Sequence, residues 1–507
     1  QPLAIGTIMA TFSSVAAAVE YESWDPNAET RAAVAQLREA GKESELEAIL
    51  GSRLQFGTAG LRGPMGPGYN RMNELVVMQT CQGLIRYMDS LDADAKNKGV
   101  IIGFDHRELG SLSSKALARI SAAVFLSQGY KTYLLEGFVP TPFVAFGVSH
   151  LGCAAGIMVT ASHNPKADNG YKVYWNNGSQ IVPPHDTGIA SQIDANLKPW
   201  QTYDTTYAGV EANALAHDVT YSIASAYYKA LSKLSNQHQT NYTNPVKTVY
   251  TAMHGVGCHW VKQAFEEFGH RPLDAVPCQA EADPTFPTVK FPNPEEKGAL
   301  DEAMKHADKQ GATLILANDP DADRLAVAEK LPSGEWNVFS GNELGVLLGY
   351  WQIQAWKAAQ QKAGTNQPAA VLASIVSSRM LQAIAAAEGM LYQDTLTGFK
   401  WLGDCAIRLR AAGTPVIFSY EEALGYCIGE QGCDKDGITA AAVFLEMAGV
   451  LHTRHLTVKQ HLQDLYSKYG EFVSYNSYLL SHDKAVTAKI FARLRTSDGG
   501  SGAQGYW

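Results

Sequence analysis

The sequence predicts an α/β protein of three successive mixed-sheet domains around a central cleft, followed by a truncated or incomplete fourth domain. Two observations lead to this prediction. The chain has 507 residues, which at about 150 residues per domain suggests three or four domains. Short β-rich runs also alternate with helical patterns in three rounds, as is typical of βαβ units. With 46% hydrophobic and 18% charged residues, the chain can fill large cores, which excludes a disordered protein.

The first round of alternation begins near Leu75. We expect strands over residues 99–104, 132–135 and 156–160, and a helix over residues 113–128. The strands are rich in β-branched residues, and the helical stretch is long enough to cover one face of a sheet.

Two further rounds follow. The second has strands over residues 246–250 and 312–317 and a helix from about Trp260, and the third has strands over residues 371–376 and 415–418 and a helix over 380–388. Polar or proline-containing stretches at residues 197–218 and after Lys330 predict linkers. The predicted domains therefore cover residues 1–215, 216–330 and 331–470. The stretch after Gly470 is too short for a similar fourth domain, so residues 471–507 are expected to form only part of one.

Composition excludes several classes of protein. The net charge of −9 provides no general attraction to nucleic acid or anionic lipid, so we expect no nucleic-acid partner. The apolar stretch at residues 3–18 is too short for a membrane span and has no basic segment before it, so no membrane partner is expected. Seven cysteines are too few to staple the chain, which favours a reducing compartment and predicts a cytoplasmic location. The sequence leaves the oligomeric state open.

Three aspartates form the most informative peptide. Asp319, Asp321 and Asp323 alternate directly after the apolar strand of the second round. In an extended loop, alternate side chains share a side, so the three carboxylates can converge on one hard cation such as Mg²⁺. A calcium EF-hand would need glycine and glutamate where this chain has Arg324 and Lys330. A solvated acidic turn is the alternative.

A serine follows the third strand of the first round. Ser162 stands where open α/β sheets present reactive groups, which makes it the candidate nucleophile. A serine hydrolase would have glycine at Thr160 and Asn164, so acyl transfer is disfavoured. His163 or Lys172 could move the proton. The alternative is that Ser162 merely caps a turn.

Three other loops could bind an anion or a sugar. Residues 56–63 hold three glycines around Arg62, a loop suited to an anion. It is not a nucleotide-binding P-loop, because the only Gly-Lys pair, at residues 41–42, lacks the upstream glycine. Residues 397–401 place Lys400 beside aromatic rings, and Glu421 directly follows a predicted strand, where a carboxylate suits sugar hydroxyls. Each of these loops alone is compatible with a purely structural role.

Together, and in this order, these peptides resemble those of the α-D-phosphohexomutase superfamily, and within it the phosphoglucomutase-2/phosphopentomutase-like branch. The resemblance extends from Trp24 to about Lys468. The matching peptides are residues 57–63, 160–165, 319–324, 397–400 and 421–425.

The resemblance implies a phosphosugar mutase that interconverts glucose 1-phosphate and glucose 6-phosphate. Ser162 would carry a phosphoryl group in the resting enzyme and pass it to the sugar phosphate, with glucose 1,6-bisphosphate as intermediate and activator. Mg²⁺ would be held by Ser162, through its phosphate, and by the three aspartates Asp319, Asp321 and Asp323. Charge neutralisation by Arg62 and Arg324, with a proton carrier such as His163 or Lys172, agrees with what phosphoryl transfer needs.

The resemblance also implies which residues recognise the substrate and where the chain departs from the family. Thr397, Gly398, Lys400 and Glu421 match the sugar-recognition loops, so the three predicted domains would carry the phosphoserine, metal-binding and sugar-recognition loops in turn. Ala423 replaces a serine common in glucose mutases, which leaves a phosphopentomutase or a glucose 1,6-bisphosphate synthase as alternatives. The arginine loop of the family's fourth domain has no clear counterpart: either part of that domain is missing from the sequence, or the clamp is lost. A catalytically silent phosphosugar sensor or scaffold is the alternative from another class.

Overall fold

The computed structural model describes residues 12–57, 59–475, 481 and 483–496. The chain divides into two compact units, residues 1–471 and 472–507. All of the peptides singled out above lie in the first unit. In the described part of the second unit there is one helix, α18 (Lys484–Thr496). A partial fourth domain over residues 471–507 stays a prediction.

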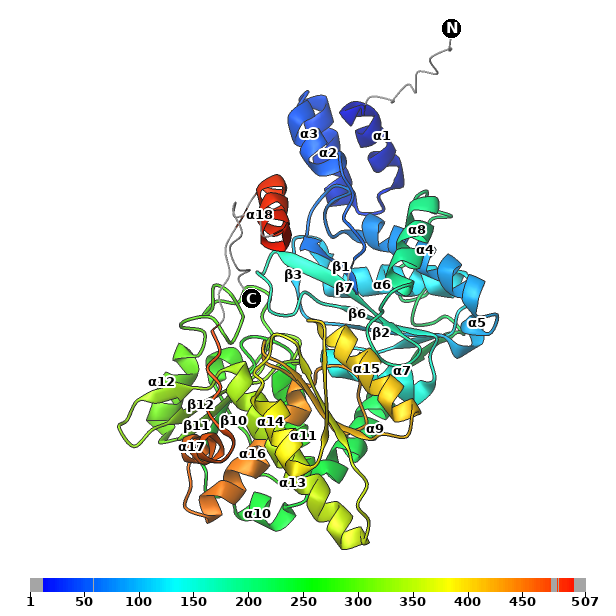
Figure 1. Cartoon of the computed structure of the whole chain (residues 1–507). Coiled ribbons are helices and arrows are strands. Elements are labelled where there is room, and N and C mark those ends of the chain that lie inside the picture. Colours follow the sequence, from blue (N-terminus) through cyan, green and yellow to red (C-terminus); the bar gives the residue numbers. More distant parts are fainter. Residues whose placement is uncertain (1–11, 58, 476–480, 482, 497–507) are drawn as a thin grey trace. The chain divides into compact units, whose positions relative to one another are not determined.

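The first unit begins with three helices, shown in blue in Figure 1. They are α1 (Ser14–Trp24), α2 (Ala28–Glu39) and α3 (Glu43–Leu50). The Asn27 side chain accepts hydrogen bonds from two backbone N–H groups of the first turn of α2, which fixes where that helix starts. Ala18, Tyr21, Val34 and Leu46 form a small buried core between the three helices.

The first sheet has six strands in the order β1-β7-β6-β2-β5-β8. Strands β6, β2, β5 and β8 are parallel, whereas β7 runs antiparallel to β6 and to the edge strand β1. The strands are β1 (Gly60–Pro64), β2 (Val100–Phe104), β5 (Thr132–Leu134), β6 (Ala155–Val159), β7 (Asp168–Trp175) and β8 (Ala216–Asp218), and the helices α4 (Glu74–Leu91), α5 (Ala95–Lys98), α6 (Ser114–Ser127), α7 (Thr141–Leu151) and α8 (His185–Ala195). The predicted linker at residues 197–218 is wrong at its end, because β8 pairs with β5 and extends this sheet. A separate two-residue hairpin joins β3 (Glu108–Leu109) and β4 (Leu112–Ser113).

The second sheet has five strands in the order β10-β9-β11-β12-β13. Strands β9, β10 and β11 are parallel, and β12 and β13 add in antiparallel fashion. The strands are β9 (Thr248–Thr251), β10 (Asp274–Ala275), β11 (Leu314–Ala317), β12 (Ala326–Lys330) and β13 (Trp336–Val338), and the helices are α9 (Thr220–Leu231), α10 (His238–Thr243), α11 (Gly257–Phe268) and α12 (Asp301–Gln310).

The third sheet has four strands in the order β15-β14-β16-β17. They are β14 (Ala370–Ser374), β15 (Leu391–Thr395), β16 (Val416–Glu421) and β17 (Gly425–Ile428), with helices α13 (Gly341–Ala363), α14 (Met380–Glu388), α15 (Phe399–Ala411), α16 (Gly437–Thr453) and α17 (Val458–Tyr469). The predicted strand at residues 415–418 is too short, because β16 continues through Glu421 in a hairpin with β17.

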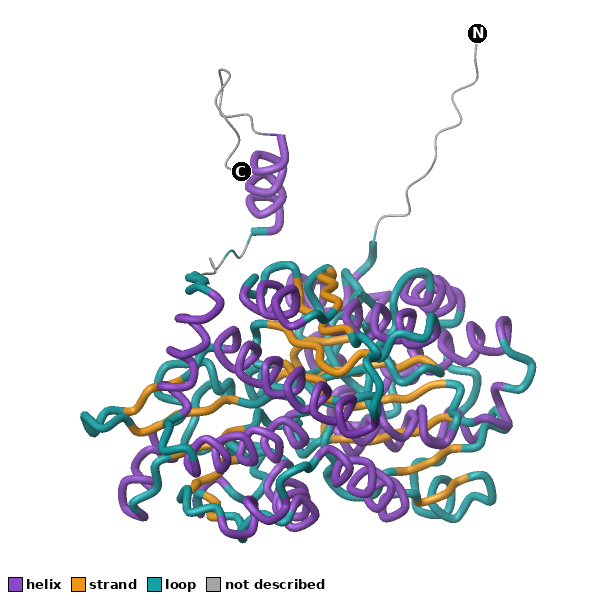
Figure 2. Tube along the Cα trace, turned by 60° about the horizontal axis from the view of Figure 1, so that its bottom comes forward, coloured by secondary structure: helices purple, strands orange, loops and turns teal. Residues whose placement is uncertain are grey.

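The three sheets share one hydrophobic core. A single cluster of buried side chains includes Ile101 of the first sheet, Val249 of the second, Phe418 of the third and most of α16. Figure 2 shows the strands lying between layers of helices. The three mixed-sheet α/β domains that the sequence predicts are therefore confirmed.

Long helices are present, yet none of those in the described residues is both long and apolar enough to cross a membrane.

Candidate active site

Ser162 lies in the loop between β6 and β7, at the carboxyl end of a parallel strand. Its backbone has φ 52°, in the left-handed region that residues other than glycine rarely adopt. The Ser162 N–H donates to Thr160 Oγ1 at 2.8 Å, and its hydroxyl donates to Asp319 Oδ2 at 2.7 Å. The side chain of Ser162 is thus held against the aspartate loop of the second sheet, 157 positions away in the sequence.

Arg107 holds this serine loop in shape, and the sequence prediction missed it. Its guanidinium donates to four backbone carbonyls of the loop, those of Ser162 (2.6 Å), Asn164 (2.7 Å), Pro165 (2.8 Å) and Asp168 (3.0 Å). The side chain is fully buried and lies 3.5 Å from a carboxylate oxygen of Asp105. Asp105 and Arg107 come directly after β2, so the rule that drew attention to Ser162 could have found them.

The aspartate loop is a tight turn, not the extended segment that the sequence prediction assumed. The N–H of Ala322 donates to the carbonyl of Asp319 at 2.9 Å, and Ala322 has φ 55°. This turn, and not simple alternation, brings the acids together. One carboxylate oxygen from each of Asp319, Asp321 and Asp323 lies within 4.8 Å of the others, and all three residues are buried.

The donor set fits a hard divalent cation. Lys172 Nζ binds the Oδ2 atoms of Asp321 (2.7 Å) and Asp323 (2.9 Å), and Thr141 also donates to Asp321 Oδ2. The Oδ1 atoms of Asp321 and Asp323 are buried without any hydrogen-bond partner. Burial and the neighbouring Asp321 and Asp323 raise the pKa of Asp319 well above its ordinary value. Unpaired buried carboxylate oxygens are costly unless a cation neutralises them.

Lys172 and His163 differ in their suitability as proton carriers. Burial opposes the charge on Lys172, but Asp321 and Asp323 outweigh this effect and raise its pKa, so the side chain stays an ammonium. Because Lys172 is charged, it is better suited to hold the carboxylates in place than to accept a proton. His163 Nδ1 lies 3.2 Å from Ser162 Oγ. Burial, together with Arg324 and Arg62, lowers the pKa of His163 to about 2, which keeps its ring neutral.

Two arginines lie near the serine and the acids. Arg324 Nε is 3.9 Å from Asp319 Oδ2 and 3.8 Å from Asp323 Oδ1. Arg62, on the edge strand β1, donates to the Asn164 side chain at 3.1 Å and so lies beside the serine loop. Both guanidinium groups are placed where they could neutralise a phosphate on Ser162.

The end of β16 meets the aspartate loop. Arg324 pairs with Gly425 in an isolated β-bridge, and its guanidinium donates to the Ala423 carbonyl at 3.0 Å. Glu421, the last residue of β16, is only 7% exposed, and burial raises its pKa although Lys435 and Arg324 oppose this. The structure therefore brings Glu421 and the three aspartates to neighbouring loops.

The other predicted sugar-binding residues stay within the third sheet's own loops. Gly398 has φ 106° and caps the start of α15, a conformation that favours glycine. Lys400 is buried, with its ammonium 5.0 Å from the centre of the Trp401 ring, and Thr397 is exposed. Within the described residues, neither Lys400 nor Thr397 bonds to Ser162 or to the aspartates.

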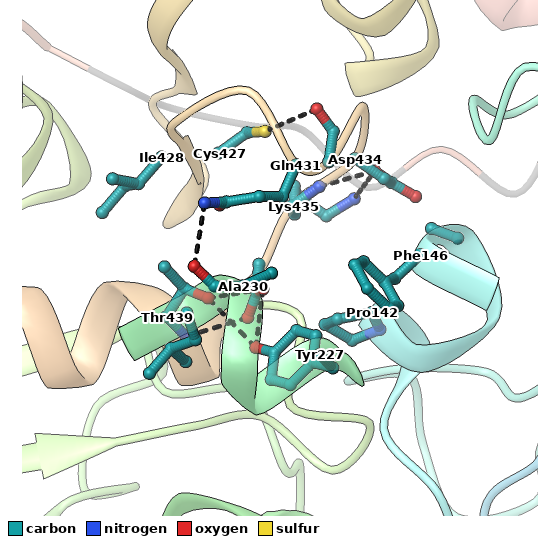
Figure 3. Close-up of a pocket in the computed structure, with 14 residues that line it drawn as sticks. Pro142, Phe146, Tyr227, Ala230, Cys427, Ile428, Gln431, Asp434, Lys435 and Thr439 are labelled. Atoms are coloured by element: carbon teal, nitrogen blue, oxygen red, sulfur yellow. Dashed lines mark hydrogen bonds and ion pairs between the residues drawn. The ribbon is translucent and has the colours of Figure 1, made fainter. Parts of the chain in front are cut away.

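Lys435 is a second residue that the sequence prediction missed. Its Nζ lies 3.5 Å from Asp323 Oδ2 and 3.4 Å from Asp434 Oδ1. Figure 3 shows Asp434 and Lys435 on the loop before α16, above a small cavity of about 30 Å³ that Tyr227 and Pro142 also line. The charged residues Asp434, Lys435 and Asp436, directly before the apolar helix α16, could have pointed to Lys435 from the sequence.

Comparison with known proteins identifies the family of the three domains. Models of the α/β/α domains I, II and III of phosphoglucomutase/phosphomannomutase match residues 53–199, 225–333 and 341–469. The chain belongs to this family. The predicted superfamily and its phosphopentomutase-like branch are confirmed, and the protein is an enzyme of the phosphomutase type.

Curated relatives of this family member carry several activities in their names. Human phosphopentomutase is 48% identical over 480 residues, covering 94% of this chain and 78% of the relative. Human glucose 1,6-bisphosphate synthase is 42% identical over 479 residues, covering 94% and 77%. The phosphoribomutase of Saccharomyces cerevisiae is 42% identical over 492 residues, covering 93% and 77%.

Solved structures share the fold at lower identity. A putative phosphomannomutase from Thermus thermophilus superposes with a TM-score of 0.65 at 22% identity, covering 83% of this chain and 84% of that one. The open form of the Paramecium phosphoglucomutase parafusin gives 0.66 at 19% identity, covering 88% and 80%.

Proposed function

We propose that this sugar phosphate mutase moves a phosphoryl group between the 1-hydroxyl and the terminal hydroxyl of an aldose phosphate, through a phosphoserine at Ser162 and a sugar bisphosphate. The observation that carries the proposal is the 2.7 Å hydrogen bond from Ser162 Oγ to Asp319 Oδ2, inside a buried cluster of three carboxylates. A hydroxyl in that position is next to the group of acids that, among the described residues, could hold a divalent cation.

Asp319, Asp321 and Asp323 would hold Mg²⁺, which when bound neutralises charge on the transferring phosphoryl group. In the first transfer the bond between phosphorus and Ser162 Oγ breaks and a bond to the sugar hydroxyl oxygen forms. The proton of that hydroxyl must end on the Ser162 oxygen that loses the phosphoryl group, and the neutral ring of His163, whose Nδ1 lies 3.2 Å from Ser162 Oγ, is the candidate to relay it. The reverse transfer from the other phosphoryl of the bisphosphate restores the phosphoserine.

Lys172 is proposed to keep the acids in place, and Arg62 and Arg324 to bind phosphate. The third domain would recognise the sugar. The buried Glu421 would accept hydrogen bonds from sugar hydroxyls, and the loop of Thr397, Gly398 and Lys400 would form the side of the site where the sugar enters. Because α15 starts with backbone N–H groups next to Gly398, an anionic group is favoured there.

The substrate pair is the finer part of the proposal. Glucose 1-phosphate and glucose 6-phosphate are one candidate pair. Ribose or deoxyribose phosphates are the other, and they are favoured by relatives named phosphopentomutase and phosphoribomutase. The relative named glucose 1,6-bisphosphate synthase supports a third candidate, in which that bisphosphate is the product.

All seven cysteines are free, which supports a reducing compartment such as the cytoplasm.

Replacing Ser162 tests the mechanism. Ser162→Ala should abolish turnover, whereas Ser149→Ala, an exposed serine outside the site, should keep the parent rate. Intact-mass measurement after incubation with glucose 1,6-bisphosphate should give a phosphate adduct in the parent and in Ser149→Ala only. Substantial mutase activity in the Ser162→Ala enzyme would refute a phosphoserine mechanism.

A substrate panel tests the choice of sugar. Initial rates with glucose, mannose and ribose 1-phosphates, each with and without added glucose 1,6-bisphosphate, separate the candidates. A mutase that loses its intermediate is activated by the bisphosphate, whereas a synthase accumulates it from another phosphoryl donor. Equal absence of turnover on all three sugars would instead support the silent sensor.

A further inference from the structure

Thr141, the first residue of α7, holds Asp321 through two hydrogen bonds. Its backbone N–H donates to the Asp321 carbonyl at 3.0 Å, and its hydroxyl donates to Asp321 Oδ2 at 2.6 Å. Both residues are completely buried. They are 180 positions apart in the sequence, so the contact joins the first domain to the aspartate loop of the second.

The backbone part of this contact follows from how α7 begins. The N–H of the first residue in a helix has no partner within that helix. Pro140, which precedes Thr141, has no side-chain group that could accept from it. The carbonyl of Asp321 supplies the missing acceptor, so the start of α7 fixes the position of the aspartate loop.

The hydroxyl of Thr141 completes the surroundings of one carboxylate oxygen. Lys172 Nζ donates to Asp321 Oδ2 at 2.7 Å and lies 3.4 Å from Thr141 Oγ1. An ammonium can only donate, so the one proton of the Thr141 hydroxyl is free to go to Asp321 Oδ2. Two donors then occupy the two lone pairs of Oδ2. Asp321 Oδ1 has no hydrogen-bond partner among the described residues.

This asymmetry between the two oxygens bears on the choice of cation. Mg²⁺ requires a small, nearly octahedral set of ligands, keeps several waters and takes one oxygen from a carboxylate. Ca²⁺ accepts more ligands in a flexible geometry and often takes both oxygens of one carboxylate. With Oδ2 saturated, Asp321 can offer only Oδ1, which suits Mg²⁺ better than Ca²⁺.

We propose that Thr141 is a positioning residue of the cation site, whose hydroxyl limits Asp321 to one free oxygen and thereby favours Mg²⁺ over Ca²⁺. The inference rests on the proposed function, because it requires that the three aspartates bind a divalent cation. A hydroxyl carries no charge, so its removal changes the orientation of the carboxylate and leaves the net charge of the site as it was.

Thr141→Val tests the role of the hydroxyl, because valine is close to threonine in shape and keeps the backbone N–H. Titration calorimetry on the full chain should show a Mg²⁺ affinity about 10- to 100-fold weaker than in the parent, as is typical when a partner of a metal ligand is lost. The Ca²⁺ affinity, measured separately with CaCl₂, should change far less, so the preference for Mg²⁺ falls. Thr141→Ser, which keeps the hydroxyl, should restore both affinities.

A second variant and a control accompany the test. Thr141→Ala also lacks the hydroxyl and should bind as the valine variant does, which provides the comparison even if the valine variant does not fold. The control is Thr80→Val in α4, where an equally buried hydroxyl donates only to the Val76 carbonyl of its own helix at 2.8 Å. It should bind both cations like the parent.

The outcomes separate this inference from the proposed function. If the parent binds Mg²⁺ and both variants without the hydroxyl bind it equally well, Thr141 has no positioning role, while the proposed function stands. If those variants lose Mg²⁺ and Ca²⁺ affinity to the same extent, the part that concerns the choice of cation is wrong. A parent that binds no Mg²⁺ would overturn the proposed cation site, and this inference with it.

Discussion

Replacing Arg107 by lysine tests whether its hydrogen bonds to the loop carbonyls hold the serine loop in its conformation. The guanidinium of Arg107 makes four hydrogen bonds of 2.6 to 3.0 Å to loop carbonyls. A lysine has one donor nitrogen and cannot span carbonyls that the planar guanidinium reaches from two nitrogens. We expect at least two of the four bonds to be lost. At about 1.5 to 3 kcal/mol for each bond to a charged group, the loss of two bonds should lower the free energy of unfolding by about 3 to 6 kcal/mol.

Arg107→Lys should also slow catalysis. Ser162 has a strained backbone that its surroundings must impose, and a shift of about 1 Å in a reacting atom can cost about 100-fold in rate. In Arg107→Lys, kcat should fall by about that factor while KM changes little, because the substrate-binding loops stay intact. Denaturant unfolding and steady-state kinetics measure the two quantities.

The matched control is Arg119→Lys in the same domain, where the guanidinium bonds to Glu211 and to the Thr205 carbonyl, away from the serine loop. It should lose stability and keep kcat. The reasoning is refuted if Arg107→Lys, compared under conditions where both variants are folded, turns over as fast as Arg119→Lys.

Two more predictions concern charge. Asp319→Asn removes a buried carboxylate whose pKa is raised by burial and by two neighbouring acids, so without metal the melting temperature of the variant should equal or exceed that of the parent. Added MgCl₂ at about 10 to 100 times Kd should stabilise the parent by about 1.4 to 2.7 kcal/mol and the variant far less. Equal stabilisation of both proteins would contradict the metal site. Burial lowers the pKa of His106 to about 4, so the unfolded chain takes up a proton below about pH 6.5 that the folded protein refuses, and stability falls as pH drops from there to about 4. Between pH 7.5 and pH 5, the free energy of unfolding of His106→Phe should therefore fall by about 2 kcal/mol less than that of the parent. The control His150→Gln, at an exposed position, should show the same fall as the parent. Identical pH profiles of stability for all three proteins would refute this assignment.

The sequence was sufficient to locate those site residues whose position follows from the strand directly before them. Ser162 and the three aspartates each directly follow an apolar run, and the edge of a sheet is where such loops gather. Their common location could thus be predicted without knowing the pairing of the strands.

What the sequence did not reveal depends on contacts between distant segments. Arg107 is 55 positions from Ser162, and nothing near either residue states that a guanidinium will meet those carbonyls. The turn at Ala322 was also hidden, because alternation of acids is compatible with an extended loop and with a turn alike. The end of β16 was misplaced because its last residues, Ser419, Tyr420 and Glu421, are polar, and their pairing with β14 and β17 is not visible in the local sequence.

Asp323 shows how the arrangement of the three aspartates depends on all three domains. Its Oδ2 lies 2.9 Å from Lys172 of the first sheet and 3.5 Å from Lys435, which follows the third sheet. With that oxygen engaged, the other oxygen, Oδ1, is left for a cation together with Oδ1 of Asp321. The ammonium groups therefore orient the carboxylates as well as offset their repulsion. Because Lys172 and Lys435 come from the first and third domains, the second domain alone would hold the three acids beside Arg324 but without the two ammonium groups that orient them.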